Sequence, residues 1–190
     1  WSGFGAPREG GRRSHHGVDI FADRGTPAVA AADALVREVE ETPVGGKVVW
    51  LRDERRSKSH YYAHLDSQVV REGERVQAGD TVGMIGNTGN ARTTPPHLHF
   101  GLYSRGEGPI DPYPFIRPLP SDPPPLQADV ERAGGWSRVR SDGAHLRARP
   151  STRAEVLAEL ASDRPFRVVA ATGSWYRGRL PDRAGGDVTE

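Results

Sequence analysis

Five of the seven histidines in this chain fall in three short clusters whose spacing suits metal-dependent chemistry. His15 and His16 lie in SHHGVDIFA, His64 lies in YYAHLDS, and His97 and His99 lie in PPHLHFGLY. Imidazole binds divalent metals and titrates near neutral pH, so it can act as a ligand, a general base or a general acid. The clusters therefore indicate a metal site that could hydrolyse a substrate.

The HLH and YYAHL segments are predicted to be strands. Because side chains alternate between the two faces of a strand, His97 and His99 should project to one side and Leu98 to the other, into a core. The same alternation places Tyr62 and His64 on one face. We therefore expect Tyr62 to contact a substrate beside His64.

His15 and Asp19 are four residues apart, with Gly17 between them. Both side-chain types are zinc donors, but in a regular strand they would lie about 13 Å apart. A bend at the glycine could let both reach one ion. One histidine of the HLH strand could supply a third ligand, leaving the fourth tetrahedral position to water, as in catalytic zinc sites.

The general base must be sought outside a metal-binding helix, because the chain has no HExxH motif. The candidates are His64 and the HLH histidine that does not bind the metal. A zinc ion lowers the pKa of its water to about 7 and polarises a carbonyl group. Hydrolysis of an amide bond is the reaction that these groups favour.

The succession of motifs resembles the lysostaphin-type (LytM-like) zinc endopeptidases of bacterial cell walls. Its segments are HHGVDIFADRGTPAVAAAD, YYAHLDS, VVREGERVQAGDTVGMIGNTGN and PPHLHF. The resemblance covers residues 1 to about 117 and includes the HxxxD, YxHL and HxH signatures in the family's order. It implies a twisted antiparallel sheet with the metal at the floor of a groove. It also implies peptidoglycan stem peptides or cross-links as substrates.

The family's functional residues carry over to five positions of this sequence. The resemblance implies that His15, Asp19 and His99 hold one zinc ion. It also implies that His64 and His97 are catalytic.

Two positions depart from the family's usual pattern. Gly101 follows HLHF where the family usually has Glu, and Ala34 ends a segment that is often ADG. Some relatives are catalytically silent and activate a cell-wall amidase instead. A silent regulator is therefore the alternative function, although all five matched positions are intact.

Three further residues receive simpler interpretations. Thr94 belongs to the TTPP loop that leads into the HLH strand, and we expect it to line the groove and contact substrate. His16 and His60 are expected to be solvated surface side chains. The segment EGERVQAGDTVG resembles a lipoyl or biotinyl carrier hammerhead, but it has no lysine at a hairpin tip to hold the cofactor.

The composition predicts an all-β chain, because short β-branched runs alternate with glycine-containing turns. These runs are KVVWL at 47–51, SQVV at 67–70, DTVGMIG at 80–86 and FRVVA at 166–170. The AEVLAEL segment at 154–160 is also predicted to be a strand. The net charge of +1 provides no general attraction to nucleic acid, and the absence of cysteine excludes disulfides and thiolate metal sites. No apolar run reaches the roughly 20 residues of a transmembrane helix.

A proline-rich segment is predicted to separate two domains. The interpretation gives a peptidase domain at 1–117, a semi-rigid linker at 118–130 and a second domain at 131–190. The second domain resembles a small bacterial SH3-like barrel through LRARPS and GSWY. Trp136 and Tyr176 are its candidate substrate contacts.

The resemblance places the protein at the cell envelope, in the periplasm or outside the cell, with peptidoglycan as its partner. The predicted linker is short enough for the second domain to reach the metal groove and narrow it, which we state as a hypothesis.

Overall fold

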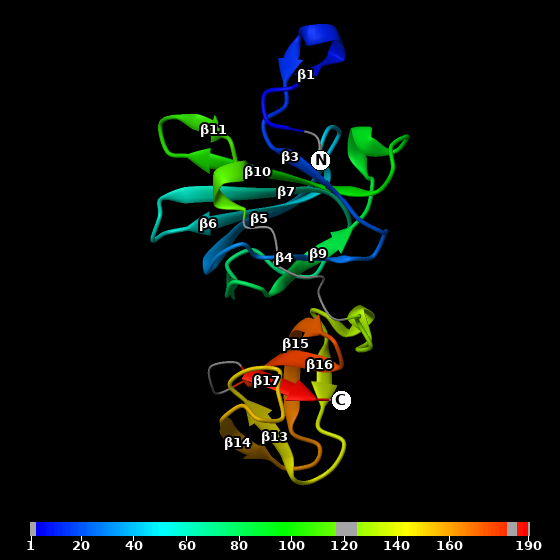
Figure 1. Cartoon of the computed structure of the whole chain (residues 1–190), viewed down its shortest axis with the longest axis vertical. Coiled ribbons are helices and arrows are strands. Elements are labelled where there is room, and N and C mark those ends of the chain that lie inside the picture. Colours follow the sequence, from blue (N-terminus) through cyan, green and yellow to red (C-terminus); the bar gives the residue numbers. More distant parts are fainter. Residues whose placement is uncertain (1–2, 117–124, 182–185, 190) are drawn as a thin grey trace. The chain divides into compact units, whose positions relative to one another are not determined.

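The computed structural model describes residues 3–116, 125–181 and 186–189, and within them the chain is almost entirely β-structure (Figure 1). It divides into two compact units, Trp1–Pro118 and Leu119–Glu190. Much of the predicted linker, residues 118–124, lies outside the described residues, so the limits of the three predicted segments stay predictions. No helix among the described residues is long and apolar enough to cross a membrane.

The first unit is built on a nine-stranded sheet in which all paired strands are antiparallel. The main path runs β11-β10-β7-β6-β5-β8, while β3 pairs with β10, β4 with β9, and β9 with β7. The strands are β3 (Val18–Phe21), β4 (Pro27–Val29), β5 (Ala34–Thr42), β6 (Gly46–Asp53), β7 (Lys58–Gln68), β8 (Arg75–Val76), β9 (Thr81–Ile85), β10 (His97–Ser104) and β11 (Gly108–Ile110).

A separate hairpin, β1 (Pro7–Arg8) and β2 (Arg13–Ser14), precedes this sheet, with a 3-10 turn at Glu9–Gly11. Two more 3-10 turns, Gly89–Ala91 and Tyr113–Phe115, lie in the later connections. The predicted all-β fold with a twisted antiparallel sheet is confirmed.

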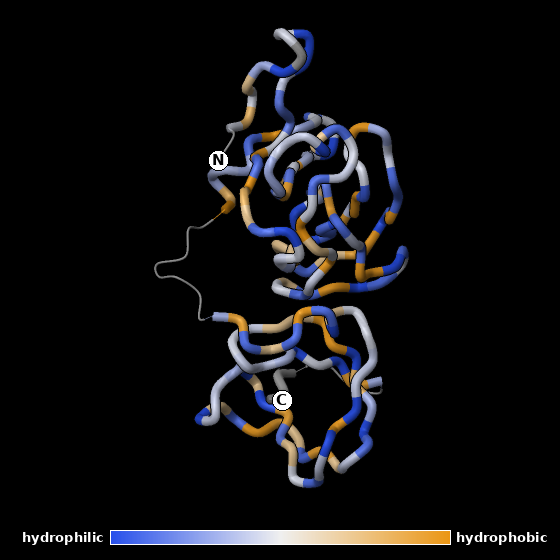
Figure 2. Tube along the Cα trace, turned by 90° about the vertical axis from the view of Figure 1, so that its right-hand side faces the viewer, coloured by the Kyte–Doolittle hydropathy of each residue, from blue (hydrophilic) through white to orange (hydrophobic). Residues whose placement is uncertain are grey.

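The core of the first unit lies on one face of the central strands. Leu98 and Phe100 of β10 are buried there, together with Leu51 of β6 and Leu65 of β7. Removing such side chains from water is the main stabilising contribution to the fold. Hydrophobic and hydrophilic stretches alternate along the trace (Figure 2). The opposite face of β10 is consequently left to carry its histidines.

The second unit is a six-stranded antiparallel sheet in the order β12-β15-β16-β17-β13-β14. Its strands are β12 (Trp136–Arg138), β13 (Ala144–Arg147), β14 (Val156–Leu160), β15 (Pro165–Thr172), β16 (Trp175–Arg179) and β17 (Gly186–Thr189), preceded by a 3-10 turn at Val130–Arg132. The predicted strands at 47–51, 80–86, 154–160 and 166–170 are present, apart from their end residues. Of the predicted strand at 67–70, only the first two residues belong to β7.

The prediction that Tyr176 contacts substrate is wrong. Its side chain is only 3% exposed and belongs to the core of the second unit, where its phenol oxygen accepts a hydrogen bond from the Asp129 N–H at 2.8 Å. The physical reason is strand alternation in β16, which buries Tyr176 and leaves Trp175 half-buried. Trp136, by contrast, is 63% exposed, so it remains a candidate contact.

Candidate metal centre

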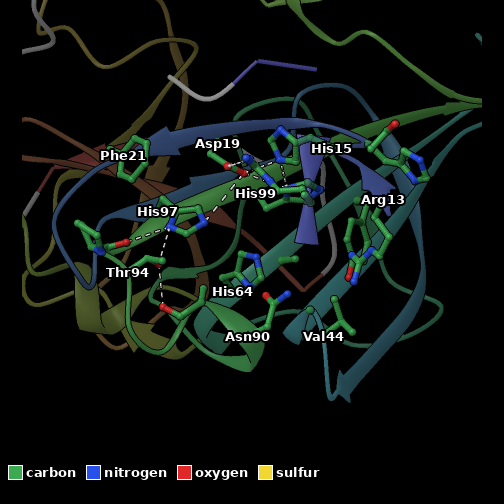
Figure 3. Close-up of a pocket in the computed structure, with 18 of the residues that line it drawn as sticks. Arg13, His15, Asp19, Phe21, Val44, His64, Asn90, Thr94, His97 and His99 are labelled. Atoms are coloured by element: carbon green, nitrogen blue, oxygen red, sulfur yellow. Dashed lines mark hydrogen bonds and ion pairs between the residues drawn. The ribbon is translucent and has the colours of Figure 1, made fainter. Parts of the chain in front are cut away.

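Three donor atoms converge in the first unit, from His15, Asp19 and His99 (Figure 3). His15 Nε2 lies 2.9 Å from both Asp19 Oδ1 and His99 Nδ1, and His99 Nδ1 lies 3.0 Å from Asp19 Oδ1. The antiparallel pairing of β3 with β10 puts Asp19 directly opposite His99. The pairing of the two strands therefore brings Asp19 and His99 together. His15 lies three residues before β3, close enough to join them.

The donor set fits a divalent cation of the zinc type. Three atoms that carry lone pairs face one another within 3.0 Å, an arrangement that repels unless a proton or a cation lies between them. Two imidazoles and one carboxylate are the ligand types of catalytic zinc sites. A pattern of three converging ligands was expected, and the structure brings together the three residues that the resemblance named.

Hydrogen bonds from neighbouring groups orient the side chains of His15 and Asp19. The Nδ1–H of His15 donates to the Gly3 carbonyl oxygen at 2.9 Å, which leaves Nε2 unprotonated toward the cluster. Arg8 Nη2 donates to Asp19 Oδ2 at 2.9 Å, so only Oδ1 faces the histidines. Sequence reasoning missed this role of Arg8, because no local pattern relates the β1 hairpin to Asp19.

Charge and burial in the cluster favour a charged Asp19 carboxylate and a neutral His99 imidazole. Burial raises the pKa of Asp19, but the hydrogen bonds and charge interactions that His15 and His99 make with it when they carry a proton outweigh burial and bring the pKa far below its usual value. Burial lowers the pKa of His99, opposed by its hydrogen bond to Asp19. A charged carboxylate and a neutral imidazole are the states that bind a metal.

Gly17 is needed for its small size, and not for the backbone bend that its position between His15 and Asp19 predicted. Its φ does not lie in the left-handed region, so no unusual backbone requires a glycine. Instead, a Cβ at this position would lie 2.8 Å from His99 Nε2 and closer still to the Phe100 carbonyl oxygen. Glycine is needed because β10 and the ring of His99 pass directly against the backbone.

The remaining two histidines of the motifs lie beside this cluster. The ring centroids of His64 and His97 lie 5.0 Å apart, and His97 Nε2 lies 4.0 Å from Asp19 Oδ1. Each Nδ1 lies 2.9 Å from a backbone carbonyl oxygen, that of Thr88 for His64 and that of Pro95 for His97. These bonds place the proton on Nδ1 and leave each Nε2 as a proton acceptor. Burial lowers the pKa of His64 to about 4, so its imidazole is neutral at physiological pH.

The expectation that Tyr62 contacts substrate is wrong. Tyr62 is 1% exposed, and its phenol oxygen accepts a hydrogen bond from the Ala31 N–H at 2.9 Å, within the core. The expected alternation of side chains between the two faces fails at this point of β7. His64 has a left-handed φ of 62°, and the register of the β6–β7 pairing shifts between Tyr62 and Leu65. As a result Tyr61, rather than Tyr62, shares the pocket with His64. Backbone strain at a non-glycine residue is typical of functional sites.

The five motif residues open into a pocket of about 680 Å³. Thr94 is exposed at its wall, as predicted, and its hydroxyl donates to the Ala91 carbonyl oxygen at 2.8 Å. Phe21 is 50% exposed and its ring lies 5.2 Å from that of His97. Sequence reasoning missed Phe21, although its spacing of two from Asp19 in a strand would place both on one face.

The expectations for the other two histidines have different outcomes. His16 is exposed, as predicted. His60 is only 5% exposed, so the prediction of a solvated side chain is wrong. Its ring packs against Phe100 on the core face, with 6.0 Å between ring centroids. The reason is that His60 lies on the same face of β7 as the core residue Tyr62, opposite the buried Leu51 and Leu102 of the neighbouring strands, and the local sequence does not reveal these neighbours.

Comparison with known families agrees with this geometry. Residues 13–112 match the profile of Peptidase family M23. The chain belongs to peptidase family M23. Residues 141–186 match the Bacterial SH3 domain profile, so this M23 peptidase carries an SH3-like domain after its peptidase domain.

Individual relatives support the same assignment. The L-Ala--D-Glu endopeptidase of Bacillus subtilis is 36% identical over 118 residues, which are 57% of this chain and 36% of that protein. The catalytic domain of lysostaphin from Staphylococcus simulans superposes with a TM-score of 0.56 and 32% identity, covering 60% of this chain and 89% of that one. A zinc containing peptidase from Vibrio cholerae gives a TM-score of 0.53 at 30% identity, covering 63% and 36%. The chain spans between 21% and 36% of the length of three curated relatives that it matches.

Proposed function

We propose that this M23 peptidase is a zinc-dependent endopeptidase that hydrolyses peptide bonds in the stem peptides or cross-links of bacterial peptidoglycan. The observation that carries the proposal is the convergence of the His15, Asp19 and His99 donors beside His64 and His97 in one pocket. The names of the relatives, among them endopeptidases of peptidoglycan, supply the substrate class. The protein would act in the cell envelope or outside the cell, where peptidoglycan lies.

In this mechanism His15, Asp19 and His99 hold one zinc ion. The ion, when bound, supplies an acidified water and polarises the scissile carbonyl group. The unprotonated Nε2 of His64 or His97 accepts a proton from the attacking water, and the protonated imidazole then donates it to the leaving amine. The backbone carbonyls of Thr88 and Pro95 keep both rings in the orientation that this transfer needs.

The test uses purified protein loaded with zinc and supplied with purified sacculi. Asp19→Ala should lose both zinc and cleavage, whereas His64→Ala should keep zinc and lose cleavage. His145→Ala, an exposed histidine of the second unit, is the matched control and should keep both. Mass spectrometry of the released fragments identifies the bond. A zinc-loaded wild-type protein that releases nothing from sacculi, yet activates an amidase, would instead support the regulator.

The second unit is proposed to bind wall material through its exposed Trp136. The hypothesis that this unit narrows the groove predicts that deleting residues 119–190 changes turnover. Unchanged turnover of both purified walls and small peptides would remove that hypothesis.

A further inference from the structure

Three aromatic side chains, tilted against one another, form a cluster in the pocket next to the metal centre, which we call the platform. Trp50 comes from β6, Tyr61 from β7 and Tyr103 from β10, and all three are half-buried and line the pocket. The ring centroids lie 4.4 Å apart for Trp50–Tyr61, 5.0 Å for Trp50–Tyr103 and 6.5 Å for Tyr61–Tyr103. The Tyr61 ring lies 5.9 Å from that of His99, so the platform adjoins the metal ligands.

Gly101 makes this platform sterically possible. It lies opposite Tyr61 in the β7–β10 pairing and on the same face of β10 as His99 and Tyr103. A Cβ at position 101 would lie 3.0 Å from Tyr103 Cε2 and 3.3 Å from Tyr61 Cβ. A larger side chain here would push the rings aside.

The chemistry of the platform suits an uncharged ligand with an apolar face. Burial raises the pKa of Tyr61 to about 12 and also raises the pKa of Tyr103, so both phenols stay protonated and neutral. The rings offer apolar faces, and the two hydroxyl groups can form hydrogen bonds at their edges. A pyranose ring matches this surface, because it combines apolar C–H faces with hydroxyl and amide groups around its rim.

The backbone under the platform argues against an extended peptide as its occupant. β6 pairs with β5 and β7, β7 pairs with β6 and β10, and β10 pairs with β7 and β11 at this level. The main-chain groups of the three strands are therefore engaged within the sheet. Peptides that bind to a sheet in extended form do so largely through main-chain hydrogen bonds at a free edge, which the platform does not offer.

We propose that the Trp50–Tyr61–Tyr103 platform is a subsite for a sugar ring of the peptidoglycan glycan. This inference rests on the proposed function. An extended peptide advances about 3.3 to 3.6 Å per residue, and the nearest ring of the platform lies 5.9 Å from the ring of a metal ligand. A sugar on the platform thus leaves room for only about two residues before the metal. The enzyme should therefore cut the stem peptide bonds nearest the sugar in preference to distant cross-links.

The experiment compares two substrates for the zinc-loaded protein: a stem peptide attached to N-acetylmuramic acid, and the same peptide without the sugar. The sugar-bearing substrate should have a kcat/KM about tenfold higher, from ring stacking. Trp50→Ala and Tyr103→Ala should each bring the ratio toward one. Phe21→Ala, on an aromatic residue beside His97 rather than in the platform, is the matched control and should keep the ratio.

A binding measurement on the metal-free protein supplies an independent readout. N-acetylmuramic acid with its carboxyl group converted to an amide, as in the peptide-bearing glycan, should shift the NMR signal of the Trp50 indole N–H, and the sugar-free peptide should not. Equal kcat/KM for the two substrates, or an indole shift caused by the peptide alone, would overturn the subsite while leaving the peptidase function intact. Failure to cleave either substrate, together with no release of fragments from sacculi, would reject the proposed function, and the indole shift would still decide whether the sugar binds.

Discussion

Gly17→Ala is the change that most directly tests how the metal centre is assembled. The added methyl group would lie 2.8 Å from His99 Nε2, whereas ordinary contacts begin at 3.4 Å. The His99 ring or the β3–β10 spacing must therefore give way by 0.6 Å, the difference between these two values. The carbonyl oxygen of Phe100 is closer still and belongs to the backbone of the sheet, so it yields less easily.

Two magnitudes follow from this overlap. Overpacking of a well-packed region costs about 1 to 3 kcal/mol, so the free energy of unfolding should fall by that amount. Metal–ligand distances in a functional site hold to within about 0.2 Å, so a displaced His99 should weaken zinc binding by about 10- to 100-fold. Both effects act on the same side chain and should appear together.

The assay measures zinc affinity by competition with a chromophoric chelator, and thermal unfolding of the metal-free protein. Gly3→Ala is the matched control. It makes the same chemical change to the unfolded chain, and a Cβ at position 3 meets nothing within 4 Å. If Gly17→Ala binds zinc as tightly and unfolds at the same temperature as Gly3→Ala, the close approach of His99 to the backbone is refuted.

Three further predictions concern the surroundings of the site. Tyr62→Phe removes the acceptor of the Ala31 N–H, so the free energy of unfolding in urea should fall by about 0.5 to 1.5 kcal/mol, with zinc affinity unchanged. An unchanged free energy of unfolding would show that this hydrogen bond does not stabilise the fold. Burial lowers the pKa of His60, so below its ordinary pKa of about 6.5 the unfolded chain binds protons that the folded chain does not, and stability should fall on acidification. His60→Gln should flatten that dependence, and equal slopes for the two proteins would refute this reasoning. Arg8→Gln should weaken zinc binding about tenfold because it releases Asp19 Oδ2, and Arg8→Lys should recover part of the affinity. Competition with a chelator measures the zinc affinity of both variants. Wild-type affinity in Arg8→Gln would show that the Arg8–Asp19 ion pair does not position the ligand.

The local pattern of the sequence was sufficient for much of the fold and of the candidate site. Alternation along HLHFGL predicts the histidines on one face and the apolar residues on the other, which is how β10 is built. The β-branched runs between glycine turns predict an all-β chain. The residues that converge on the metal centre belong to short motifs, whose residue types and spacing predict a set of candidate ligands and proton carriers. The resemblance to the lysostaphin-type family, rather than the spacing, named His99 as the third ligand.

Other features depend on which strands become neighbours. Asp19 and His99 are 80 residues apart and meet only through the β3–β10 register. Tyr62 moves to the core because a register shift and a left-handed His64 reverse the expected faces. The aromatic platform needs three strands aligned at the level of Gly101. The sequence determined which side chains each strand could present, because alternation is a local property of the backbone. Only the tertiary structure decided which of them share a site, because hydrogen-bond register between distant segments is not encoded in any one of them.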